Sequence, residues 1–191
     1  MVSRTGWTAA ALAAAVGVQR LWELRKSAHH ERAIREKGGR EHAPEQMRWM
    51  RLLHGAWIVA APIEVFLLRR RASPGVAAAA LGCFAVGQGL RFAAMRALGE
   101  RWTVRVMTLP GAPAVDTGIF RYLRHPNYLG VVLEMAALPM VHGAFVTAVV
   151  ASLANAALLR ARIAAEEEAL RTDSGYDALE RTPRFIPGFA A

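Results

Sequence analysis

Cysteine and charged residues are both scarce in this chain. Cys83 is the only cysteine among 191 residues and lies in an apolar run, so the chain can form neither an internal disulfide framework nor a cysteine-ligated zinc site. Charged residues make up 20% of the sequence and hydrophobic residues 54%, which is too apolar for a soluble domain with a polar surface. The composition favours a protein folded in a membrane, and no metal site is expected.

Long apolar stretches that end in basic residues recur along the chain. They cover residues 5–24, 49–68, 74–95, 127–141 and 143–159. A helix needs about 17 to 25 residues to cross a membrane. The last two stretches are joined too closely to be independent crossings, so they are predicted to form a helical hairpin whose turn Pro139 and Gly143 bracket. The expected fold is all-α, a polytopic integral membrane protein with about five transmembrane helices and a cytoplasmic C-terminal helix.

The first stretch shares features with a secretory signal peptide, since Arg4 precedes an alanine-rich run. The apolar run continues into residues 19–24 without a small-residue cleavage site, which favours a retained first span. The segment 25–48 carries both charge signs and is interrupted by Gly38 and Gly39, so a helix and turn at the membrane surface are predicted there. No repeat or linker divides the sequence, and a single domain over residues 1–191 is expected.

Basic residues give the chain a formal net charge of +9 but do not form a stripe interleaved with aromatic residues. Nucleic-acid binding is therefore disfavoured. Eighteen Lys or Arg residues fall in segments 25–51, 96–124 and 160–184, against four in the segments predicted on the other side. The positive-inside rule predicts that the first set faces the cytoplasm of a cell inner membrane and that the amino terminus lies outside.

A dense group of polar residues borders the fourth apolar stretch. Residues 118–130 contain Arg124 and His125 before a predicted helix start, where Asn127 can cap the helix and unpaired backbone donors favour an anion such as a carboxylate. Glu134 follows inside the span, a costly position for an acid unless it faces a cavity or a partner. The alternative is that these residues are membrane anchors and interface residues.

A second polar group continues the last span. Arg162 and Glu166 share a helix face, and Glu167 with Arg171 has the favoured order for an ion pair. Ordinary surface ion pairs are the alternative, although Arg before Glu is the weaker order for the pair of Arg162 and Glu166. A zwitterionic amino-acid group, however, needs Arg or His for its carboxylate and Glu for its ammonium, and the hairpin returns both groups to the same membrane face.

These two groups together resemble the isoprenylcysteine carboxyl methyltransferase family. The resemblance rests on the string Arg124 to Gly130 with Glu134, on Arg162, Glu166, Glu167 and Leu170, on Leu98-Gly99 with Trp102 and Thr103, and on Tyr176, Arg181, Pro183, Ile186 and Pro187. It covers roughly the last hundred residues. It implies an S-adenosylmethionine pocket closed by the hairpin and the tail, with membrane helices in residues 1–95 and a cofactor-binding catalytic part in residues 96–191.

Carried over to this sequence, the resemblance implies two sets of site residues. Residues expected to bind S-adenosylmethionine are Tyr122, His125, Tyr128, Leu129, Gly130 and Glu166. Residues expected to be essential for catalysis are Arg162, Glu167 and Glu134.

The amino-terminal half resembles bacterial members associated with type III polyketide synthases, which methylate hydroxyls of alkylpyrones and phenolic lipids. The resemblance rests on residues 20–24, Ser27, Gly38-Gly39, Glu41 and Leu53-His54, whereas Gln46-Met47 stands in place of an expected His-Tyr pair. The favoured reaction is methyl transfer to an oxygen of a lipid-like acceptor that enters from the bilayer.

A phenolic acceptor would benefit from a base, for which His125, Glu134 and His54 are candidates. Methylation of a prenylcysteine carboxylate or a lipid amine is an alternative. An NADPH-dependent sterol reductase shares the Arg-His-Pro-Asn-Tyr-Leu-Gly string, but its motif continues with an acid where this chain has Val131. A non-catalytic membrane protein is the remaining alternative.

Overall fold

Long helices dominate the part of the chain that the computed structural model describes, residues 4–176 and 180–185. They are α1 (Arg4–Glu36), α2 (Gln46–Leu68), α3 (Pro74–Leu98), α4 (Pro126–Met140) and α5 (Phe145–Ser174). Two short 3-10 helices, η1 (Gly99–Arg101) and η2 (Gly118–Arg121), and two short strands, β1 (Arg40–His42) and β2 (Val106–Thr108), lie between them. The predicted all-α class is confirmed, with one small strand pair added.

Local sequence explains the turns at one end of the bundle. Arg69 ends α2 in the left-handed conformation, and Ser73 caps α3 by accepting a hydrogen bond from the backbone N–H of Val76 at 3.3 Å. The predicted hairpin is formed by α4 and α5, and Gly143 in its turn has φ of 87°. A Cβ at Gly143 would lie 3.0 Å from the backbone nitrogen of Ala72, so the hairpin turn lies against the α2–α3 connection.

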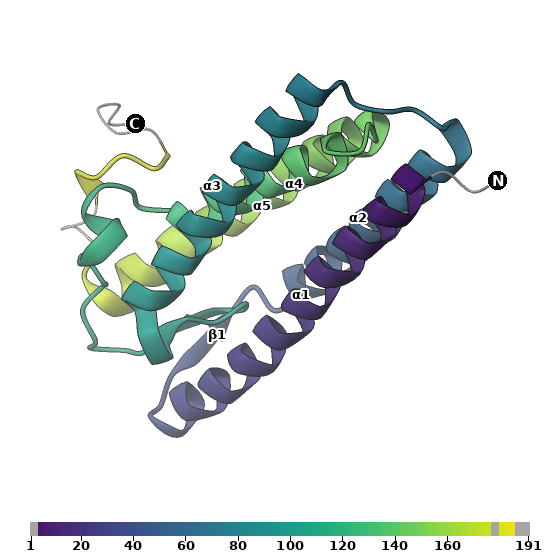
Figure 1. Cartoon of the computed structure of the whole chain (residues 1–191). Helices are drawn as coiled ribbons and strands as arrows, with labels where there is room; N and C mark the ends of the chain where they lie inside the picture. Colours follow the sequence, from purple (N-terminus) through teal and green to yellow (C-terminus); the bar gives the residue numbers. More distant parts are fainter. Residues whose placement is uncertain (1–3, 177–179, 186–191) are drawn as a thin grey trace.

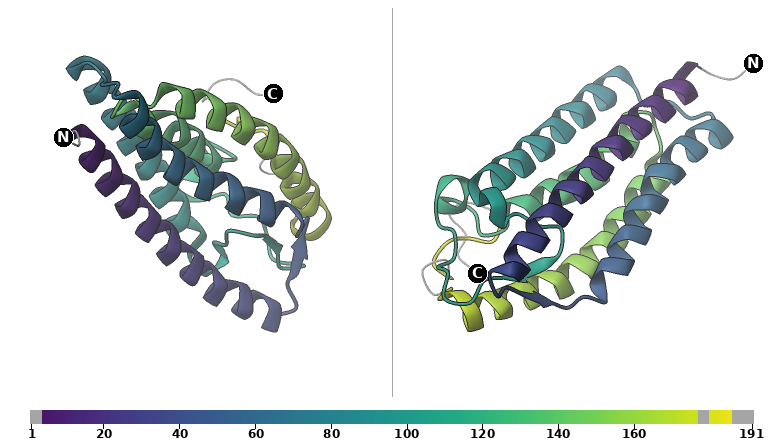
Figure 2. Two further views of the ribbon diagram at one scale, coloured as in Figure 1. Left: turned by 90° about the vertical axis from the view of Figure 1, so that its right-hand side faces the viewer. Right: turned by 90° about the horizontal axis from the view of Figure 1, so that it is seen from below.

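The connections between the helices lie at two opposite ends of the bundle (Figures 1 and 2). The start of α1, the α2–α3 connection and the hairpin turn lie at one end, and the strand pair, η2 and the end of α5 lie at the other. The three Lys/Arg-rich segments predicted to face the cytoplasm therefore share one end of the molecule. Which membrane face this end occupies stays a prediction.

Among the described residues, three helical segments are long and apolar enough to cross a membrane, namely Gln46–Leu68, Pro74–Arg101 and Phe145–Ser174. Large apolar side chains lie on their outer surfaces, with Leu67 75%, Phe92 66% and Leu153 68% exposed. Such a density of exposed apolar side chains is typical of a surface that faces lipid. The crossing of α1 and α4, and hence the count of five, stays a prediction.

The helix of residues 25–36 is continuous with α1 instead of forming a separate surface helix. Glu23, Ser27, His30 and Ile34 form one buried face along it. The Ser27 hydroxyl accepts a hydrogen bond from the backbone N–H of Val104 at 2.7 Å, and the His30 ring lies 2.7 Å from the carbonyl oxygen of Trp102. The segment that follows α3 thus holds the end of α1 in the bundle.

The strand pair was not predicted, because strands of three residues carry no readable alternation. β1 and β2 pair antiparallel, with Arg40 opposite Thr108 and His42 opposite Val106. The Glu41 carboxylate pairs with both Arg35 and Arg105. The strand pair joins the α1–α2 connection to the segment that follows α3.

Close approach of α3 and α4 depends on two glycines. A Cβ at Gly130 would lie 2.6 Å from the carbonyl oxygen of Gly87, and one at Gly87 would lie 2.9 Å from that of Gly130. Small residues that allow two helices to approach closely are typical of membrane helix contacts. This contact sets the position of α4, which carries much of the candidate site.

Candidate active site

A cavity of about 610 Å³ lies between the α1–α2 pair and the start of α4 with the second half of α5. This volume is typical of small-molecule sites, which span roughly 300 to 1,000 Å³. Part of its wall is polar, with Arg124, His125, Tyr128, Arg162 and Glu166. Another part is apolar and comes from α1 and α2, with Leu21, Ile58 and Val59 among its residues.

The two parts of the wall lie at different depths in the bundle. Met50 of α2 packs against the cluster of Tyr128, Leu159 and Ile163 near the polar part. Ile58 lies eight residues further along α2, which corresponds to roughly 12 Å of helix. The cavity therefore extends along α2 from a polar region to one that combines apolar residues with the charged side chains of Arg20, Glu23 and Arg91.

Tyr128 connects the two residue groups singled out in the sequence. Its hydroxyl donates to the Glu166 carboxylate and accepts a hydrogen bond from Nε of Arg162 at 3.0 Å. Arg162 also donates to the carbonyl oxygen of Val104. Arg162 and Glu166 are therefore joined through Tyr128, and the simple ion pair between them that the sequence also allowed is not found among the described contacts.

Glu167 is the centre of a buried ion cluster behind the cavity wall. Its carboxylate accepts hydrogen bonds from Nε2 of His125 at 2.9 Å and from Nε and Nη2 of Arg184 at 2.9 and 2.6 Å. A guanidinium nitrogen of Arg124 lies 3.5 Å away, and Arg171 lies 3.8 Å away. Glu167 is 2% exposed and does not line the cavity, so its contacts hold neighbouring side chains in place.

The described part of the C-terminal tail, residues 180–185, crosses the start of α4. The backbone N–H of Arg124 donates to the carbonyl oxygen of Pro183 at 2.9 Å, and that of His125 donates to Arg184 at 3.2 Å. Phe185 lies against the His125 ring, with centroids 6.3 Å apart. These two backbone donors are thus used by the tail instead of being left for an anion. Ile186 and Pro187, which also carry the resemblance, lie outside the described residues.

Asn127 does not cap α4, contrary to the prediction. The helix begins at Pro126, and the residue at the cap position is His125, whose side chain makes no capping hydrogen bond. Proline suits the first helical position because it has no N–H to leave unpaired. Asn127 instead lines the cavity, and its buried Oδ1 has no hydrogen-bond partner among the described residues.

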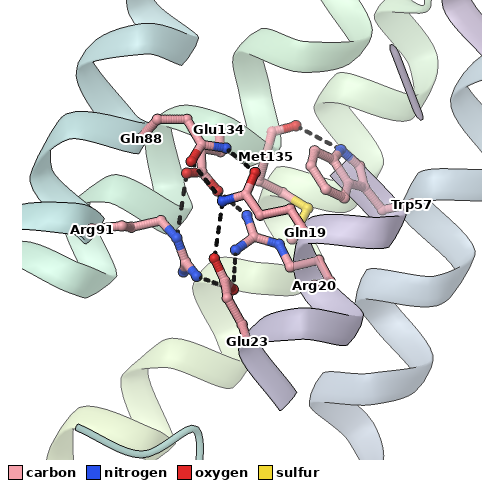
Figure 3. A network of polar contacts seen from close by, with 8 residues as sticks. All are labelled: Gln19, Arg20, Glu23, Trp57, Gln88, Arg91, Glu134 and Met135. Atoms are coloured by element: carbon pink, nitrogen blue, oxygen red, sulfur yellow. Dashed lines mark hydrogen bonds and ion pairs between the residues drawn. The ribbon is translucent and has the colours of Figure 1, made fainter. Parts of the chain in front are cut away.

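Glu134 lies in a separate polar network deeper in the bundle, shown in Figure 3. It pairs with Arg20 of α1 and lies 3.4 Å from Nε of Arg91 of α3, while Glu23 accepts hydrogen bonds from both arginines at 2.6 Å. Glu134 is 1% exposed and does not line the cavity, whereas the other three residues do.

Sequence reasoning did not single out Arg20, Glu23 and Arg91 as a group. They lie in apolar helices, where charged residues usually pair with one another or face a cavity, and that position was the available signal. Gln19 and Gln88 extend the network through an amide hydrogen bond of 2.8 Å.

The three remaining residues predicted to bind the donor do not line the cavity. Tyr122 is 63% exposed, and Leu129 is half-buried, and neither lines the cavity. Gly130 is buried against α3 and does not line the cavity either. Tyr176 lines it, and burial raises the pKa of its phenol to about 12.

Comparison with known proteins finds one family and two uncharacterized bacterial relatives that match this chain. The profile of the isoprenylcysteine carboxyl methyltransferase family matches residues 80–172, which include all the residues predicted to bind the donor or to be essential for catalysis, but not the base candidate His54. The uncharacterized protein YpbQ of Bacillus subtilis is 31% identical over 157 residues, covering 81% of this chain and 91% of the relative. An uncharacterized protein of Haemophilus influenzae is 30% identical over 154 residues, covering 79% and 88%. The chain belongs to the isoprenylcysteine carboxyl methyltransferase family of membrane methyltransferases.

Proposed function

We propose that this protein transfers a methyl group from S-adenosylmethionine to an oxygen of a lipid-like acceptor, with the hydroxyl of an alkylpyrone or phenolic lipid favoured. The observation that carries the proposal is a single cavity with a polar wall of both charge signs and an apolar wall further along α2. Family membership favours methyl transfer over NADPH-dependent reduction and over a non-catalytic role.

The polar wall fits the amino-acid group of the methyl donor. Arg162 can bind its carboxylate, and Glu166 can bind its ammonium group. The unpartnered Oδ1 of Asn127 offers a further acceptor for an N–H group. Tyr128 holds the two charged residues at fixed positions before the donor binds, and such preorganisation reduces the entropy cost of binding.

The bound donor supplies a methyl group on a cationic sulfonium, and the chain's residues align the acceptor with it. Transfer needs an oxygen placed in line with the methyl group and the exclusion of water. The apolar residues Leu21, Ile58 and Val59 favour a long-chain acceptor in the part of the cavity that they line. Leu21 and Val59 are 58% and 56% exposed, so they form an exposed apolar edge of the cavity. The structural roles of Glu167 and Glu134 make both residues positioning residues in this proposal.

We also propose that the Lys/Arg-rich end faces the cytoplasm of the inner membrane, with the amino terminus outside. Positive charge concentrated at the end that holds the polar wall supports this orientation. The donor would then enter from the cytoplasm and the acceptor from the bilayer.

Calorimetry with detergent-purified protein tests the proposal. The wild type is expected to bind S-adenosylmethionine and not NADPH. Glu166→Gln is expected to weaken donor binding by roughly 10- to 100-fold, because one hydrogen bond to a charged group contributes about 1.5 to 3 kcal/mol. Glu168→Gln is the matched control, since Glu168 is 75% exposed and does not line the cavity.

A second step uses a labelled methyl donor and purified acceptors in lipid vesicles. Labelling of a long-chain alkylphenol or an alkylpyrone is expected, with a prenylcysteine and phosphatidylethanolamine as comparison acceptors. Binding of NADPH alone, or equal donor binding by wild type and Glu166→Gln, would contradict the proposed site.

A further inference from the structure

His54 presents an unused ring nitrogen at the cavity. It lines the cavity from α2, one turn beyond Met50, and its Nδ1 lies 2.9 Å from the carbonyl oxygen of Met50. A carbonyl oxygen only accepts hydrogen bonds, so Nδ1 carries the proton and Nε2 of the neutral ring has a lone pair. No described residue makes a hydrogen bond to this Nε2.

Contacts on two sides fix the orientation of the His54 ring. Besides the hydrogen bond to Met50, the ring lies edge-on to Trp57, with centroids 6.3 Å apart and planes at 77°. Trp57 is itself held, because it is 2% exposed and its indole N–H donates to the carbonyl oxygen of Met135 at 3.1 Å. A ring held in this way keeps one nitrogen directed away from its own helix backbone.

The other two base candidates are less well placed for the acceptor. Nε2 of His125 donates to the Glu167 carboxylate, which leaves a lone pair on Nδ1, but His125 belongs to the polar wall that suits the donor and not to the apolar wall that suits the acceptor. Glu134 pairs with two arginines and does not line the cavity. His54 lies between Met50, near the polar wall, and Ile58 of the apolar wall, where the reacting end of a long-chain acceptor would lie.

A buried donor nitrogen in the same cavity suits an oxygen that becomes negative. Arg20, Arg91 and Glu23 line the cavity together with His54, and each arginine is paired with Glu23 and Glu134. The Nε of Arg20 is buried without a hydrogen-bond partner among the described residues. Fixed cationic donors stabilise an oxygen as negative charge develops on it.

We propose that His54 is a catalytic residue whose Nε2 takes the proton of the acceptor hydroxyl, an inference that rests on the proposed methyl transfer. The O–H bond breaks and its proton goes to Nε2, while the oxygen's electron pair forms the new O–C bond to the methyl carbon of the sulfonium donor. The electron pair of the broken S–C bond stays on sulfur as a neutral thioether. The imidazolium then returns its proton to water. A hydroxyl acceptor that is still protonated thus needs His54, whereas an acidic acceptor that arrives ionised does not.

Two acceptors of different acidity test this role in the full-length protein in vesicles. With a long-chain alkylphenol, His54→Ala is expected to lower kcat by roughly 10²- to 10⁴-fold, the usual range for loss of a general base. With an acidic alkylpyrone, the loss is expected to be about 10-fold or less. The rate of His54→Ala with the phenol should rise with pH as phenolate forms, and added imidazole should restore part of it. His29→Ala is the matched control, because His29 is exposed and does not line the cavity.

Nuclear magnetic resonance of ¹⁵N-histidine-labelled protein gives a readout independent of activity. His54, assigned by the signal lost in His54→Ala, is expected to be neutral and protonated at Nδ1. Protonation at Nε2 alone would overturn the proposal, as would equal losses with both acceptors or no loss with either. Wild type that binds the donor but methylates no phenol would also overturn it. Failure of the wild type to bind S-adenosylmethionine would instead overturn the proposed function.

Discussion

Replacing Glu167 with glutamine should loosen the tail from the start of α4. Glu167→Gln keeps the size of the side chain but removes the charge that holds His125, Arg124 and Arg184. Loss of one partner in a fully buried ion pair costs about 3 to 5 kcal/mol. The side chain of Arg184 is 43% exposed, and glutamine retains one acceptor oxygen. We therefore expect the loss of tail stability to be smaller than for a fully buried pair, at about 2 to 3 kcal/mol.

Amide hydrogen exchange measures this effect at the site. The backbone N–H groups of Arg124 and His125 donate to tail carbonyl groups, so their protection reports how often the tail opens. A cost of 2 to 3 kcal/mol corresponds to roughly 30- to 150-fold faster exchange at these two amides. Protection in α2 and α3 should change little, since among the described residues no hydrogen bond or ion pair joins Glu167 to either helix.

The adjacent residue provides the control. Glu168 is 75% exposed and pairs with Arg171 at 3.7 Å, so Glu168→Gln should change exchange less than about 3-fold. Equal exchange in the two variants would refute the inference that Glu167 holds the tail. Uniformly faster exchange in Glu167→Gln would show instead that the charge supports the whole bundle. A cycle with Arg184→Ala should give a coupling energy of about 1 to 3 kcal/mol.

Two further predictions concern helix packing and acid stability. Gly130→Ala should lower stability to thermal unfolding by about 1 to 3 kcal/mol. The reason is that its Cβ would lie 2.6 Å from both the carbonyl oxygen of Gly87 and Cγ of Arg91. Gly82→Ala serves as control, because a Cβ at Gly82 would meet nothing within 4 Å. Similar unfolding temperatures for these variants would contradict the close contact. Burial raises the pKa of Glu41, but hydrogen bonds from Arg105 and Arg35 outweigh it and hold the pKa below the ordinary 4.5. The stabilisation is therefore full above pH 4.5 and is lost as pH falls through the lower folded value, so Glu41→Gln should flatten the acid limb of an unfolding titration.

The helical part of the fold was predictable because long apolar stretches and their breakers are local features. The predicted second span ends at Leu68 and the third begins at Pro74, as observed. The hairpin turn was found between Pro139 and Gly143, and the continuation of α5 to Ser174 is helical as expected. A helix was predicted after residue 24, but its continuity with the first span and its burial were not, because its buried face at residues 23, 27, 30 and 34 is built from mostly polar residues.

The candidate site was predictable as a list of residues and not as an arrangement. Spacing placed Arg162 and Glu166 on one face, but their connection through Tyr128 depends on how α4 and α5 pack. The pair of Arg20 and Glu134 joins residues 114 positions apart, and such contacts leave no local pattern. Glu134 was placed at the site because an acid in an apolar helix signals a partner, yet the sequence does not say which one.

The network of Figure 3 also bears on how the protein enters its membrane. Arg20 and Glu23 are synthesised with α1, whereas their partners Arg91 and Glu134 belong to α3 and α4. Until those helices arrive, Arg20 and Glu23 have only each other as partners, 2.6 Å apart within α1. If α1 crosses the membrane as predicted, this pair lowers its insertion cost below the about 2.5 to 3.5 kcal/mol of an unpaired charge near the bilayer centre, but the remaining hydrogen bonds form only with α3 and α4. With α1 crossing as predicted, the first helix therefore reaches its final free energy only after α3 and α4 have joined it.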